Sequence, residues 1–269
     1  MIKSLLYILL FCSVTAVMAL LGIFISSIIV EHSLYSLFGI NKVEVAVYVV
    51  AVMGVIWALL LFYIFTRNGY SSFSLGTLYG RRFWLCIVLS IFIFLSLNIL
   101  AFWCHHLAMP FSNEHLLKIE IYRAHPLMTL VTLLLLYSVT QLVFMGGVLR
   151  ELSADIGRRW AAQLTVALLL SFLNLFEGGA GGVIIFLFAV CEGLIESWLW
   201  FATRSIWPSV IGAVFSEYII WMFLGNIPTS MLALAAVVLL PVSLYGMKML
   251  LGRGQTIQSP VADRHLLQS

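Results

Sequence analysis

The sequence predicts an all-α, polytopic membrane protein with about eight transmembrane helices. Of its 269 residues, 63% are hydrophobic and only 9% are charged, and the mean hydropathy is +1.11. No soluble core could bury that much apolar surface, so the bilayer is the expected solvent. The spans must be helices, because in lipid each backbone N–H and C=O group has to find its partner within its own segment.

The individual spans follow from apolar runs of about 20 residues, the length that a helix needs to cross hydrocarbon. We expect them near residues 5–30, 45–66, 83–104, 126–148, 161–176, 183–203, 206–224 and 229–251. The first run is too long for the apolar part of a signal peptide and lacks a clear cleavage site, so we expect an uncleaved span. Residues 1–252 therefore form a single transmembrane domain, and the polar stretch 253–269 is predicted to be a disordered cytoplasmic tail.

The charges between the spans predict the orientation of the chain. With the N-terminus inside, eleven of the 14 lysines and arginines fall on the inner side. Only Lys42, Lys118 and Arg123 fall on the outer side. Because cytoplasmic loops carry an excess of Lys and Arg, both termini are predicted to lie in the cytoplasm.

Composition and cysteine spacing also exclude several classes of protein. The four cysteines, Cys12, Cys86, Cys104 and Cys191, lie within or at the ends of apolar runs and show no paired spacing. Neither a disulfide framework nor a zinc knuckle is therefore predicted. No basic patch interleaved with aromatic residues is present, so no nucleic-acid partner is expected.

A group of potential metal ligands follows the third span. It consists of Cys104, His105, His106, His115 and His125. These residue types bind transition metals, but their spacing matches no known ligand pattern. Solvated or interfacial histidines are the simpler interpretation, and no metal or other cofactor is predicted.

One segment resembles a family signature but lacks the residues that would carry out its chemistry. Residues 140–152 read TQLVFMGGVLREL. This segment resembles the E-E-x-x-F-R-G-x-L-x-x-x-L signature of the CPBP family, the CAAX-protease and bacteriocin-processing intramembrane proteins. Phe144, Gly146 and Leu152 keep the frame, whereas Thr140 and Gln141 replace the paired glutamates of the family.

Two further elements continue this resemblance, which covers about residues 126–225. Residues 172–176 resemble the F-x-x-x-H element of the family, and residues 205–217 resemble its S-L-W-P segment leading into H-x-x-x-N. Phe176 and Ala213 stand at the histidine positions of the family, and Glu217 stands at its asparagine position. The substituted motif positions of the chain are Thr140, Gln141, Met145, Phe176, Ala213 and Glu217.

The resemblance implies a CPBP-like core in a bacterial cytoplasmic (inner) membrane, but without proteolytic chemistry. In that family the glutamates and histidines meet in a cavity near mid-membrane, where a carboxylate activates water for amide cleavage. Neither Thr140 nor Gln141 can accept a proton at working pH, and Phe176 and Ala213 offer no metal ligand. No catalytic residue is therefore assigned at these positions.

Several polar side chains nevertheless remain in the region of the lost site. The candidate polar cavity consists of Gln141, Asn174, Glu192, Glu196, Ser216 and Glu217. Glutamates inside spans are costly unless they are paired or neutral, so they are candidates for function. The alternative is structural, with a neutral Glu192 hydrogen-bonded to Gln141, Asn174 or Ser216, and with Glu196 as a wetted ion pair near Arg204.

Three functional hypotheses follow. The first is a catalytically inactive CPBP-type protein that acts as a scaffold, chaperone or immunity factor for another membrane protein or a hydrophobic peptide. The second is an intramembrane protease or other hydrolase with relocated chemistry on Glu192, Glu196 and Glu217. The third is an ion-coupled carrier, against which stands the lack of inverted repeats in the two halves.

Overall fold

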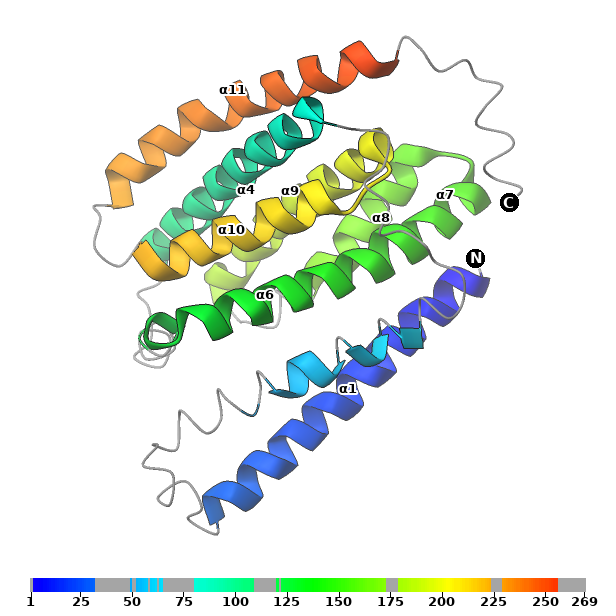
Figure 1. Cartoon of the computed structure of the whole chain (residues 1–269), viewed down its shortest axis with the longest axis vertical. Helices are drawn as coiled ribbons and strands as arrows, with labels where there is room; N and C mark the ends of the chain where they lie inside the picture. The colour runs from blue at the N-terminus through cyan, green and yellow to red at the C-terminus, as the bar shows by residue number, and fades with distance from the viewer. Residues whose placement is uncertain are drawn as a thin grey trace.

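The computed structural model of the chain describes residues 2–31, 49, 52–57, 59–61, 63–64, 80–108, 120, 122–172, 179–223 and 229–255. Within this part of the chain all regular structure is helical, and there is no strand. The helices run roughly side by side as a bundle, with α1 along one edge and α11 along the opposite edge (Figure 1). The predicted all-α class is therefore confirmed.

The helices follow one another in a simple order. They are α1 (Ile2–Glu31), α4 (Arg81–Ala108), α6 (Pro126–Gln141), the π-helix η1 (Leu142–Leu149), α7 (Arg150–Ile156), α8 (Arg159–Ser171), α9 (Gly179–Thr203), α10 (Trp207–Phe223) and α11 (Thr229–Gln255). The segments α6, η1 and α7 follow one another without a break, so that one long rod runs from Pro126 to Ile156.

Four helical segments are long and apolar enough to cross a membrane. They are Arg81–His105, Pro126–Ala154, Gly182–Thr203 and Ser230–Gly252. These segments contain nearly all of the predicted spans at 83–104, 126–148, 183–203 and 229–251, and they identify an integral membrane protein. Shorter apolar helices are found at Leu20–Ile29, Val52–Leu61 and Trp207–Phe223. The described residues thus contain four candidate spans, and the full set of eight remains a prediction.

Local sequence explains where several helices start and stop. Pro126 opens α6 in the first helical turn, where its missing N–H costs nothing. Gly157 ends α7 with φ 67°, a left-handed conformation that glycine adopts without a steric penalty. Arg204 ends α9 in the same conformation, with φ 55°, although it carries a side chain.

Close approach between helices depends on two glycines. A Cβ atom on Gly212 of α10 would lie 2.6 Å from Phe94 Cδ2 and 2.9 Å from Ser90 Cβ, both on α4. A Cβ atom on Gly193 of α9 would lie 2.9 Å from the backbone Cα of Ala167 on α8. Small residues let membrane helices pack tightly, so these two glycines allow α10 to approach α4 and α9 to approach α8.

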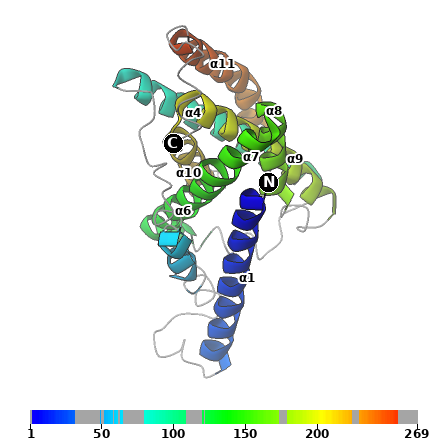
Figure 2. The ribbon, with the colours of Figure 1, turned by 90° about the vertical axis from the view of Figure 1, so that its right-hand side faces the viewer.

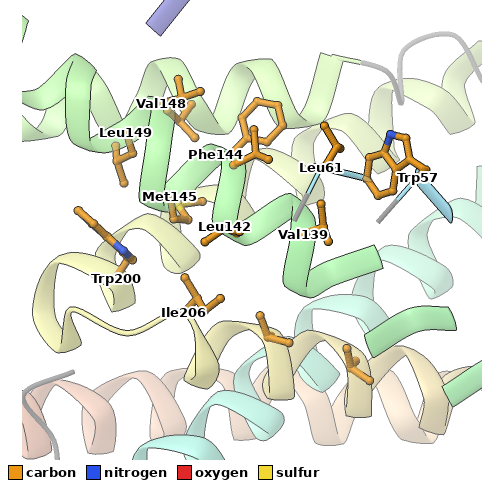
Figure 3. Close-up of a cluster of buried hydrophobic side chains, with 14 of the residues drawn as sticks. Trp57, Leu61, Val139, Leu142, Phe144, Met145, Val148, Leu149, Trp200 and Ile206 are labelled. Carbon is orange, nitrogen blue, oxygen red and sulfur yellow. The ribbon is translucent and has the colours of Figure 1, made fainter. Parts of the chain in front are cut away.

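The core has two parts. The first surrounds η1, whose residues are all buried, and contains Phe144, Met145, Trp200 and Ile206 (Figure 3). The second joins α4 to α9, α10 and α11; within it the Cys86 thiol lies 3.5 Å from the Met247 sulfur. The π-helical turn therefore lies at the centre of the first core, directly after Gln141.

Several arginines gather at one end of the bundle (Figure 1). The start of α1, the start of α4, the α7–α8 turn, the α9–α10 turn and the end of α11 lie at one end (Figures 1 and 2). The arginines of these segments include Arg81, Arg82, Arg150, Arg158, Arg159 and Arg204. We call this the basic end of the bundle.

Candidate functional site

Glu217 on α10 is held by hydrogen bonds at both carboxylate oxygens. The Tyr137 hydroxyl on α6 donates to Glu217 Oε2 at 2.6 Å. The Trp221 indole N–H, one turn further along α10, donates to Glu217 Oε1 at 3.1 Å. A carboxyl group that accepts hydrogen bonds from two donors is well oriented, so Glu217 fastens α6 to α10.

This contact extends to the segment that precedes α6. Arg123 Nε donates to the backbone carbonyl of Trp221 at 3.1 Å. The Tyr122 ring packs edge-on against the Trp221 ring, with centroids 5.2 Å apart. Burial raises the pKa of Tyr122, and the charge of Glu217 raises it further. We call Tyr122, Arg123, Tyr137, Glu217 and Trp221 the Glu217 network.

Gln141 on α6 meets Glu196 on α9. Gln141 is 2% exposed and Glu196 is 7% exposed. Their side chains are hydrogen-bonded, with the amide as the donor to the carboxylate. Glu196 therefore lies in the interior against Gln141. It is not the solvent-exposed partner of Arg204 that one structural interpretation of the sequence expected.

Glu192 lies one turn before Glu196 on the same face of α9. Glu196 and Glu217 are both within electrostatic range of it. Its Oε1 atom is buried and has no hydrogen-bond partner among the residues that the structure describes. The Gln141 Oε1 atom is also buried and also has no hydrogen-bond partner among the described residues. We call Glu192, Glu196 and Glu217 the carboxylate cluster.

Ser216 faces α4. Its hydroxyl accepts a hydrogen bond from Asn98 Nδ2 at 3.0 Å and donates one to the backbone carbonyl of Ala213 at 2.8 Å. The bond from Asn98 joins α4 to α10, whereas the bond to Ala213 lies within α10. Asn174, the remaining member of the predicted polar group, lies outside the described residues.

Three other substituted positions of the predicted motifs, Thr140, Met145 and Ala213, make local or apolar contacts. The Thr140 hydroxyl donates to the Leu136 carbonyl in its own helix at 2.8 Å. Met145 is fully buried in the first core, as Figure 3 shows, and Ala213 is buried in the second. Phe176 lies outside the described residues. Within the part of the chain that the structure covers, no group of three or more His, Cys, Asp or Glu residues could hold a metal ion.

Two residues of this region escaped the sequence prediction. Tyr137 lies four residues before Gln141, hence on the same face of α6, and this i, i+4 spacing was the available signal. Asn98 is a lone amide in the apolar span of α4, where a polar side chain favours a partner on a neighbouring helix.

No protein-family model, curated protein or solved structure matches this chain.

Proposed function

We propose that this chain is a non-catalytic membrane protein with a CPBP-like core at about residues 126–225. In this proposal it acts as a scaffold, chaperone or immunity factor for another membrane protein or a hydrophobic peptide. Its single transmembrane domain spans residues 1–252 and crosses a bacterial inner membrane eight times, with both termini in the cytoplasm. The gathering of described arginines at one end of the bundle supports this orientation.

The main support for the proposal is that the polar side chains of this region form hydrogen bonds with one another. Both oxygens of Glu217 accept hydrogen bonds, from Tyr137 and Trp221. Gln141 stands where the family has a glutamate and donates to Glu196. A general base needs a lone pair directed at water or substrate, and an amide cannot remove a proton. These contacts suit polar fastening between helices better than hydrolysis.

The test compares the lengths of the membrane proteins in cells that lack the chain with their lengths after the chain is returned. We expect none of them to change in length when the wild-type chain is returned, because the chain cuts no substrate. The returned Glu192→Gln variant is expected to act as the wild type does. Glu120→Gln is the matched control, since Glu120 is exposed and lies outside the candidate spans. A membrane protein that is shortened by the wild type but not by Glu192→Gln would overturn the proposal.

A second candidate function is hydrolysis on the carboxylate cluster. The buried Oε1 atoms of Glu192 and Gln141, both without a partner among the described residues, favour it. Such atoms cost free energy unless something binds them, and they occur at functional sites. In this case Glu192 acts as the general base, and Glu192→Gln abolishes an activity while expression stays normal.

A third candidate, an ion-coupled carrier, draws on the same oxygens. It predicts pH-dependent or cation-dependent flux in proteoliposomes that contain the purified chain. Glu192→Gln would remove this flux, and its absence from the wild type would exclude a carrier.

A further inference from the structure

Two arginines at the basic end share one aromatic ring. Arg159 Cζ lies 5.7 Å from the centroid of the Phe201 ring, and Arg204 Cζ lies at the same distance of 5.7 Å. Arg204 also stacks on Trp200, at 5.4 Å. Trp200 packs edge-on against Phe201 with centroids 5.1 Å apart, and it belongs to the first core (Figure 3). The two guanidinium groups thus rest on a platform that is fixed to the interior.

The backbone holds one of these groups at the membrane boundary. Arg204 directly follows the candidate span Gly182–Thr203. Its N–H donates to the carbonyl of Trp200 at 2.7 Å, and its φ is 55°. Helices that end in this conformation usually have glycine there. An arginine at this position places a guanidinium at the depth where lipid headgroups begin.

The surroundings match a headgroup region. Arg158, Arg159 and Arg204 are all exposed. Trp160, next to Arg159 at the start of α8, is 63% exposed. Exposed tryptophan together with arginine is typical of the membrane–water interface, because the indole ring favours the headgroup level.

We propose that Arg159 and Arg204 bind the phosphate group of an anionic lipid. A guanidinium carries its N–H donors in its own plane, where they match the oxygens of a phosphate. Because both groups lie over the Phe201 ring, we expect them to reach a single phosphate together. A soluble phosphate compound has the same chemistry, but the position directly beyond the end of a span favours a lipid. This site is separate from the carboxylate cluster and does not depend on the proposed function.

Lipid titration of the purified full chain in detergent provides the test, with bound lipid counted by native mass spectrometry. The probes are phosphatidylglycerol and phosphatidylcholine. We expect phosphatidylglycerol to bind more tightly, and the double variant Arg159→Gln/Arg204→Gln to weaken its binding by roughly 30-fold. If the double variant fails to fold, Arg159→Gln alone is expected to weaken binding by about fivefold.

A matched control uses the two exposed arginines that open α4. Arg81→Gln/Arg82→Gln removes the same charge from the same end of the bundle and is expected to leave the affinity for phosphatidylglycerol unchanged. Equal weakening in both double variants would overturn the proposal, because binding would then follow total charge. The proposal would also be overturned if inorganic phosphate stabilised the wild type as much as phosphatidylglycerol does, because the ligand would then be a soluble phosphate compound.

Discussion

The Tyr137 hydroxyl lies 2.6 Å from Glu217 Oε2, and this hydrogen bond joins α6 to α10 across 80 positions of the sequence. Because Trp221 occupies the other oxygen, the Glu217 carboxylate is fixed from two sides. Glu217 thus has a structural role, because it joins α6 to α10. The stability of the bundle should therefore respond to each partner of Glu217.

Tyr137→Phe should destabilise the protein by about 1–2 kcal/mol, because it removes one donor and leaves a buried acceptor oxygen behind. The measurement is the free energy of unfolding in mixed detergent micelles. Tyr245→Phe is the control, since Tyr245 is 65% exposed on α11, and it should change stability by less than about 0.5 kcal/mol. Equal effects of the two substitutions would contradict the role given to Tyr137.

Gln141→Glu should destabilise the protein by about 2–3 kcal/mol, because it replaces the donor to Glu196 with a second buried carboxyl. Gln141→Met should cost less, since it also removes the unpartnered Oε1 atom. Thermal unfolding of the two variants, with Gln163→Glu on α8 as the control, checks this order. Full stability of Gln141→Glu would show that Glu196 does not depend on the amide.

Gly193→Ala and Gly212→Ala should both be harmful, because at each site the new Cβ atom would meet an atom that is fixed to a neighbouring backbone. At Gly193 the methyl group would meet the Ala167 backbone at 2.9 Å, which cannot rotate away. At Gly212 it would meet the Phe94 ring at 2.6 Å and the Ser90 Cβ atom, which is fixed to the α4 backbone, at 2.9 Å. We expect a loss of about 3 kcal/mol at each site.

Gly246→Ala provides the control for this pair, because its nearest neighbour, Leu89 Cδ2, lies at 3.4 Å. It should be neutral or slightly stabilising, as alanine favours a helix more than glycine does. Unfolding measurements in which Gly193→Ala costs no more than Gly246→Ala would contradict the packing of α8 against α9.

The proposed orientation predicts which single cysteines can be labelled from outside intact cells, in a chain whose native cysteines are replaced. Arg158→Cys at the basic end should resist a membrane-impermeant maleimide until the cells are permeabilised. Ser230→Cys, at the start of α11 and hence at the opposite end, should react at once. Both side chains are exposed. The reverse labelling pattern would show that the basic end lies outside the cell, which contradicts the proposed orientation.

The sequence predicted the class and four of the spans because long apolar runs need no partner to be recognised. It could not predict how the helices pair. A helix that is apolar on all sides does not mark which face meets which neighbour, so the contacts of Tyr137 with Glu217 and of Asn98 with Ser216 went unpredicted. The π-helical turn after Gln141 was also missed, since its hydrogen-bond register leaves no sequence period.

The most direct test of the central claim, that the chain acts by binding rather than by cutting, is partner stoichiometry. The tagged full chain is purified from its own membranes in mild detergent, and the molar ratio of any second membrane protein or peptide is measured for the wild type and for Glu192→Gln. We predict a fixed stoichiometric partner that both forms retain equally. No stoichiometric partner with the wild type, together with an uncut protein trapped on Glu192→Gln, would contradict the account and favour hydrolysis on the carboxylate cluster.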